Sequence, residues 1–194
     1  MSRLGVVLLS LAVITGCTSE PPATEQKPQP TELLTGRSAF QKLFIAAHGW
    51  APDARPFQLQ SRIIGDNQGK DGKAAIWSGS FASETQRSSK PYLWSGVDSP
   101  DAPSRGVSPG SKDSYVPNNV FDSNFLKVDS DKAYEVAQKH GGDKIGDSPV
   151  TYLLDWNRTG NNLIWHVIYG ASRNEAKLVV DLDATTGEFI RKEK

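Results

Sequence analysis

The chain has 194 residues, with 22 Lys and Arg residues against 22 Asp and Glu residues, so its formal net charge is zero. This balance provides no basic face for a nucleic-acid partner and no acidic tail. A hydrophobic content of 37% and five tryptophans are sufficient for the core of a folded domain. The single cysteine excludes a disulfide within one molecule.

The N-terminal segment has the pattern of an export signal. Arg3 precedes an apolar run over residues 4–14, which ends at Thr15-Gly16-Cys17. The run is too short for a permanent membrane helix, which needs about 20 residues, but it has the length of a cleaved apolar region, roughly 7–15 residues. The stretch Ile14-Thr15-Gly16-Cys17 resembles the lipobox of bacterial lipoproteins, in which a branched apolar residue and two small residues precede the cysteine.

The lipobox resemblance implies that residues 1–16 are a signal peptide and that Cys17 is the lipid attachment site, carrying diacylglycerol and an acyl chain such as palmitate. Each buried methylene contributes about 0.8 kcal/mol, so two or three acyl chains would hold the protein on a membrane. Because Thr18 and Ser19 follow the cysteine and no aspartate does, we expect the outer membrane in a Gram-negative host, with the domain facing the periplasm or the exterior. The alternatives are an ordinary secretory signal that contains a cysteine, or an uncleaved anchor.

Residues 17–36 are predicted to form a flexible, proline-rich tether. Pro21-Pro22, Pro28 and Pro30 lie among Glu, Gln, Thr and Lys residues, with few aliphatic side chains. Such a segment cannot bury enough apolar area to order itself. Its expected role is to hold a folded domain away from the lipid surface.

The first folded segment, residues 37–116, is predicted to contain a helix followed by antiparallel strands. Helical spacing of apolar residues predicts a helix over residues 39–47, with Ser38 as its cap. Strands are predicted near residues 57–64, 74–81 and 91–95. Residues 97–128 hold four prolines together with aromatic residues, and we expect an ordered connector that wraps the junction with the second segment.

The second folded segment, residues 117–194, repeats this order. A helix is predicted over residues 130–140, where Gly141-Gly142 provides the stop. Strands are predicted at residues 150–156, 163–169 and 177–182. The repetition predicts an α+β fold of two units, each a helix packed on a small antiparallel β-sheet.

Three features of the second segment resemble one known family. They are the helix that leads into Gly141-Gly142, the tryptophan-containing strand at residues 163–169, and the last strand and turn at residues 179–190. Together they resemble a PepSY-type domain, a small module of secreted protease propeptides and envelope proteins, and the first segment shares the resemblance only through the repeat. The resemblance implies a fold and a cell-envelope location, because this family shares no active site. Its propeptide members also imply a protein partner, a peptidase that the module restrains.

Trp77, Trp94 and Trp165 are the candidate partner-binding residues. A strand face with large aromatic side chains can dock a peptide or a protein. The same residues are equally suited to a core, because a buried Trp needs only one hydrogen-bond partner. Trp165 and His166 are expected on opposite faces of one strand.

No catalytic residue, metal site or cofactor is predicted. The histidines His48, His140 and His166 are far apart in the sequence, and none has a second His or Cys ligand nearby. No Gly-x-Ser-x-Gly motif occurs, and Cys17 is expected to be consumed by the lipid.

Carboxylates remain the candidates for acid–base catalysis, because the fold could bring two of them together as a pair. These candidates are Asp53, Asp71, Asp155 and Asp181. Residues 181–188 also suggest a calcium loop, but they do not match an EF-hand, and a turn in which Asp183 caps backbone amides is the simpler interpretation.

The sequence therefore predicts a lipid-anchored envelope protein that acts without catalysis as a protein- or peptide-binding or regulatory module, and the resemblance to propeptides implies a peptidase as the protein it would restrain. A structural accessory subunit of an envelope complex is the first alternative. An enzyme with a carboxylate site is the second.

Overall fold

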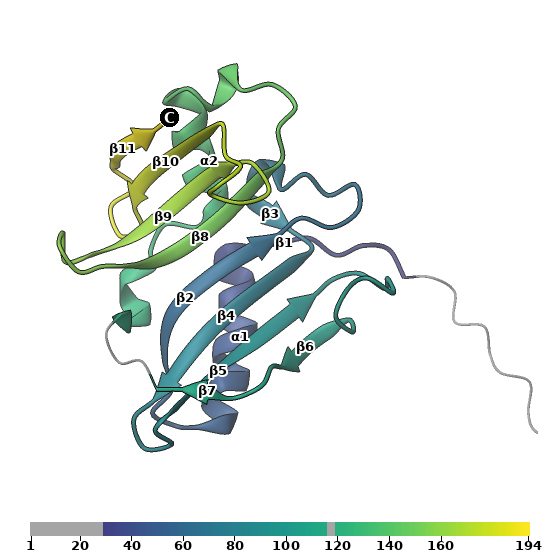
Figure 1. Cartoon of the computed structure of the whole chain (residues 1–194), viewed down its shortest axis with the longest axis vertical. Helices are drawn as coiled ribbons and strands as arrows, with labels where there is room; N and C mark the ends of the chain where they lie inside the picture. The colour runs from purple at the N-terminus through teal and green to yellow at the C-terminus, as the bar shows by residue number, and fades with distance from the viewer. Residues whose placement is uncertain (1–28, 116–118) are drawn as a thin grey trace, which may run out of the picture.

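The computed structural model describes residues 29–115 and 119–194, so the predicted signal peptide and Cys17 lie outside the described residues. The described chain forms one nine-stranded antiparallel sheet, with helices α1 (Gly36–Trp50) and α2 (Ser130–Lys139) packed on the same face (Figure 1). Neither described helix is long and apolar enough to cross a membrane.

The large sheet has the strand order β11-β10-β9-β8-β2-β4-β5-β6, and β7 pairs with β5 beside β6. In chain order its strands are β2 (Arg55–Arg62), β4 (Ile76–Ser83), β5 (Ser88–Ser95), β6 (Gly106–Pro109), β7 (Asp113–Ser114), β8 (Val150–Asn157), β9 (Asn162–Tyr169), β10 (Leu178–Asp183) and β11 (Phe189–Glu193). Two further strands, β1 (Leu34–Thr35) and β3 (Lys73–Ala74), form a separate pair. Short 3-10 helices lie at Lys70–Gly72, Ser123–Phe125 and Gly142–Lys144.

The predicted fold class, two units that each have their own small sheet, is wrong. The first long strand after each helix, β2 and β8, pair with each other antiparallel through Gln58–Asp155, Leu59–Leu154 and Gln60–Leu153. The strands of both segments therefore form one sheet, and both helices share one core. The physical reason is that a strand edge carries unpaired N–H and C=O groups, and joining the two edges pairs them in the middle of the sheet.

Helix α1 begins three residues before its predicted start. The cap is Thr35, whose hydroxyl accepts a hydrogen bond from the Ser38 N–H, so Ser38 lies inside the helix. The buried residues of the helix include Ala39, Phe40, Leu43 and Ala47. This stripe has the helical spacing expected from the sequence.

The N-termini of the two helices meet at Asp129, the residue before α2. One carboxylate oxygen of Asp129 accepts hydrogen bonds from the N–H groups of Ser130 and Arg37, at 2.7 and 2.8 Å. The other oxygen accepts the Thr35 hydroxyl at 2.7 Å. A single carboxylate thus satisfies backbone donors of both helices, which otherwise would have no partner within their own helix.

Contacts with the folded domain also hold the connector, residues 97–128, and the described end of the predicted tether. Phe121 and Leu126, in the connector, are buried in the core, and the Phe121 N–H donates to Pro56. Strands β6 and β7, which were not predicted, lie in the same connector. In the described part of the predicted tether, the Arg105 guanidinium donates to the Pro30 carbonyl at 2.8 Å.

Candidate functional site

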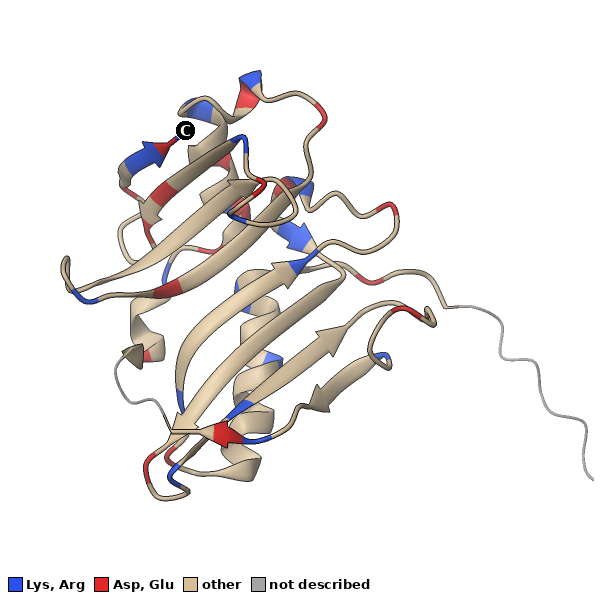
Figure 2. Ribbon diagram, viewed as in Figure 1, with Lys and Arg blue, Asp and Glu red and all other residues tan. Residues whose placement is uncertain are grey.

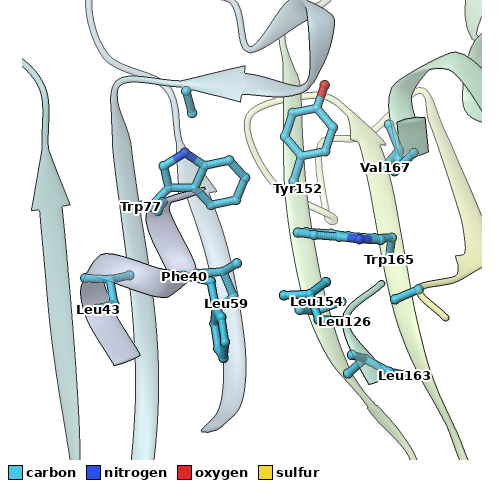
Figure 3. Close-up of a cluster of buried hydrophobic side chains, with 14 of the residues drawn as sticks. Phe40, Leu43, Leu59, Trp77, Leu126, Tyr152, Leu154, Leu163, Trp165 and Val167 are labelled. Carbon is cyan, nitrogen blue, oxygen red and sulfur yellow. The ribbon is translucent and has the colours of Figure 1, made fainter. Parts of the chain in front are cut away.

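The three tryptophans predicted to bind a partner lie in the core. The exposed fraction is zero for Trp77 and Trp165 and 2% for Trp94. The rings of Trp77 and Trp165 meet edge to face at 6.4 Å between the two sheet halves (Figure 3). Their indole N–H groups donate to the carbonyls of Leu34 and Val128, both at 2.9 Å. Burial matches the core alternative and leaves these three side chains almost no surface for a partner of the folded domain.

The face of the sheet opposite the helices, here called the outer face, carries a cluster of charged side chains. In the register of the sheet, His166 on β9 lies opposite Leu153 on β8 and Asp181 on β10, and Asp181 lies opposite Arg191 on β11. Because alternate residues of a strand point to opposite faces, His166 lies on the face away from Trp165. Charged residues lie along β10 and β11, whereas β2, β4 and β5 contain few (Figure 2).

His166 lies between two carboxylates. Its Nδ1 is 2.6 Å from Asp181 Oδ1, and its Nε2 is 3.2 Å from Asp155 Oδ1. The second oxygen of Asp181 accepts from Arg191 Nε at 2.8 Å. The cluster continues to Glu193, which pairs with both Arg191 and Arg173. Three acidic and three basic side chains are therefore connected on this part of the outer face.

The charges of the cluster determine its protonation. Burial alone lowers the pKa of His166, but the hydrogen bonds and charges of Asp155 and Asp181 outweigh it and raise the pKa to about 9. Burial alone raises the pKa of Asp181, and His166 and Arg191 lower it below its ordinary value. At neutral pH His166 is thus an imidazolium that donates from both ring nitrogens, and Asp181 is ionised.

This protonation leaves His166 without a free nitrogen for general-base chemistry. A catalytic base works best with a pKa near the operating pH and needs a substrate proton within hydrogen-bond reach. Both ring nitrogens of His166 are already bound to carboxylates. The arrangement instead fits a structural role, in which side-chain hydrogen bonds connect β8, β9, β10 and β11.

The other predicted carboxylates lie elsewhere. The Thr85 N–H and the Ser83 hydroxyl bind Asp53 and lower its pKa to about 2. Asp71 lies in the short helix Lys70–Gly72. The fold thus brings together Asp155 and Asp181 of the four predicted carboxylates, and it places an imidazolium between them.

The remaining sequence predictions concern turns and metal ligands. Asp183 Oδ1 accepts the N–H groups of Thr185 and Thr186, as expected for a capped turn. His48 binds the Phe44 carbonyl, and His140 stacks on Phe189. Within residues 29–115 and 119–194, no three His, Cys, Asp or Glu side chains are grouped closely enough to hold a metal ion.

A groove opens on the outer face beside the charged cluster. The pairing of β2 with β8 ends at Gln60 and Leu153. At the next position the Tyr152 N–H donates to the Ser61 hydroxyl at 2.9 Å, so its acceptor is a side chain and not a backbone carbonyl of β2. The groove has a volume of about 430 Å³. Its lining comes from the end of β2, from β8 and β9, and from the loop after β9: Gln60, Ser61, Arg62, Ile63, Thr151, Tyr152, Leu153, Ile168, Ala171, Ser172 and Arg173. We call this the seam groove.

Sequence reasoning did not find the cluster or the groove. The only signal in the sequence was the presence of Asp155, His166 and Asp181 within otherwise apolar strands. Their contacts depend on strand register, which a single strand pattern does not specify.

No family model, no curated protein and no solved structure matches this chain. The resemblances to a lipobox and to a PepSY-type domain therefore stay predictions.

Proposed function

We propose that this chain is a lipid-anchored protein of the bacterial cell envelope that binds a protein or peptide on the outer face of its sheet and does not act as an enzyme. The observation that carries the proposal is the asymmetry of the sheet. The two described helices cover one face, and the seam groove opens on the other. Concave sites with apolar walls and a few polar groups are the usual places for ligands.

The state of the ionisable groups supports a role without catalysis. Among the described carboxylates with a resolved shift, Asp53, Asp181 and Asp183 all have a pKa below the ordinary value. A general acid would require a raised pKa, as in glycosidases. The cluster around His166 is instead charge-balanced and hydrogen-bonded.

The groove also favours binding over the alternative of a structural accessory subunit. A purely structural subunit would need no concave site with two arginines on the face that the two α-helices leave open. A peptidase as the partner rests on the PepSY resemblance alone. The membrane location rests on the lipobox and on Cys17.

The proposal can be tested by photo-crosslinking in intact cells, with the full chain at its native membrane. A photoreactive residue at Gln60, which is exposed and lines the groove, should form an adduct with a discrete envelope protein. The control position is Ile45, which is 74% exposed on α1, on the helix side of the domain. Adducts that are equally abundant from Ile45, or absent from Gln60, would contradict binding on the outer face.

A further inference from the structure

The seam groove has a distinct chemical character. Ile63 and Leu153, which are partly exposed, provide an apolar surface above the buried Ile168, and Arg62 and Arg173 provide positive charge. No Asp or Glu is among the described residues that line it. Its volume of about 430 Å³ lies within the range of roughly 300–1,000 Å³ that is common for ligand sites.

The two arginines differ in how they are held. Arg173 donates to Glu193 at 2.9 Å, and its side chain is still 40% exposed. Its Nη1 is 3.4 Å from His166 Nδ1, but that nitrogen donates to Asp181 and cannot accept from Arg173. A guanidinium has five N–H donors, so Arg173 retains donors for a ligand while Glu193 fixes its position.

Arg62 is exposed at the end of β2, and no hydrogen bond or ion pair joins its guanidinium to another residue in the described part of the chain. A ligand carboxylate could therefore pair with the Arg62 guanidinium without first breaking an ion pair within the protein. Charge-assisted hydrogen bonds from Arg to carboxylates are short and about twice as strong as neutral ones.

We propose that the seam groove binds an acidic peptide, whose carboxylates pair with Arg62 and Arg173 while a neighbouring apolar side chain lies on Ile63 and Leu153. This inference rests on the proposed function and names its ligand class. A peptide fits better than a free inorganic anion, because the aliphatic surface next to the arginines adds affinity only for a ligand that carries apolar groups beside its charge.

The test is fluorescence anisotropy with the full chain in detergent. The probe is a fluorescein-labelled hexapeptide of alternating Leu and Glu, and the control peptide has Gln in place of each Glu. The variants are Arg62→Gln and Arg173→Gln, and the matched control is Arg158→Gln. Arg158 lies in the exposed turn between β8 and β9, so this variant removes the same charge without changing the groove.

We expect the Glu peptide to bind and the Gln peptide to bind at least tenfold more weakly. Each groove variant should weaken binding of the Glu peptide by about tenfold or more, the size of a charged hydrogen bond, and Arg158→Gln should change it less than twofold. Equal binding of the two peptides, or groove variants that bind like the unchanged protein, would overturn the proposal. If neither peptide binds while the Gln60 adduct persists in cells, the ligand class is wrong and the proposed function stands; if the adduct is also absent, both fail.

Discussion

His166 Nδ1 lies 2.6 Å from Asp181 Oδ1, and the Asp181 side chain has no exposed surface. A carboxylate that is buried this completely stays ionised only if its charge is compensated nearby. Arg191 provides one compensating charge at 2.8 Å, and His166 provides the other as long as it is protonated. The stability of this half of the sheet should therefore depend on the protonation of a single histidine.

The free energy of unfolding should fall as pH rises from neutral to alkaline. The folded pKa of His166 is about 9, above its unfolded value of 6.5, so its stabilising contribution is complete below pH 6.5 and is lost as pH rises through 9. From this difference we expect a loss of about 3 kcal/mol across that range. Urea unfolding at successive pH values measures it, and His166→Gln provides a control without the titrating group. A flat profile for the unchanged protein would show that His166 is not held as an imidazolium.

Asp129→Ala should remove the cap of α2 and, at the same time, an acceptor at the N-terminus of α1, whose own cap is Thr35. The variant loses acceptors for the N–H groups of Arg37 and Ser130 and for the Thr35 hydroxyl. Because each acceptor lost at a helix N-terminus costs about 1 kcal/mol, we expect a loss of about 2 kcal/mol in the free energy of unfolding. The control is Asp122→Ala, since Asp122 caps only the 3-10 helix Ser123–Phe125. The role of Asp129 as an acceptor for both helices is contradicted if denaturant unfolding gives the two variants the same stability.

Two glycines of α1 should respond in opposite directions to replacement by alanine. A Cβ on Gly36 would lie 2.6 Å from Trp165 Cη2, so Gly36→Ala forces the tryptophan rings to move. We expect the variant to lower the free energy of unfolding, because overpacking costs about 1–3 kcal/mol and the better helix propensity of Ala offsets at most roughly 1 kcal/mol of it.

Gly49→Ala is the matched control, because a Cβ there meets nothing within 4 Å. This variant should gain about 0.5–1 kcal/mol from helix propensity alone. Thermal unfolding of both variants compares them directly. If Gly36→Ala is as stable as Gly49→Ala, the close packing of the tryptophans against the start of α1 is not as described.

The helices and most of the long strands could be predicted from the sequence because their apolar periodicity is strong. The predicted strand at 163–169 differs from β9 (Asn162–Tyr169) by one residue, and the predicted helix at 130–140 from α2 (Ser130–Lys139) by one. Strand β11 (Phe189–Glu193) has almost no buried side chain, so no alternating pattern indicated it.

The joining of the two halves could not be predicted in the same way. The pairing of β2 with β8 consists of backbone hydrogen bonds between Gln58–Gln60 and Leu153–Asp155, and backbone groups carry no sequence signal. Two of the three tryptophans that suggested a docking surface, Trp77 and Trp165, instead pack against each other at this junction. The arginines of the seam groove come from segments over a hundred residues apart and meet only through this pairing.

The lipid anchor is predicted from Cys17 and its neighbours and can be tested separately from the fold. Growth of the native host with an alkyne-tagged palmitate analogue should label the unchanged protein, and Cys17→Ala should lose the label because the thiol is the site of attachment. Ser19→Ala, two residues further on, should keep it. An unlabelled unchanged protein would contradict the anchor.

Binding of a partner in the seam groove is tested most directly by photo-crosslinking from Gln60 in intact cells. The photoreactive residue at Gln60 is placed in the unchanged protein, in Arg62→Gln and in Arg158→Gln, and the adducts are quantified from intact cells. We expect the adduct to be lost or strongly reduced in Arg62→Gln and retained in Arg158→Gln, because only the first arginine lines the seam groove. An adduct of equal abundance in all three would show that the seam groove does not hold the partner.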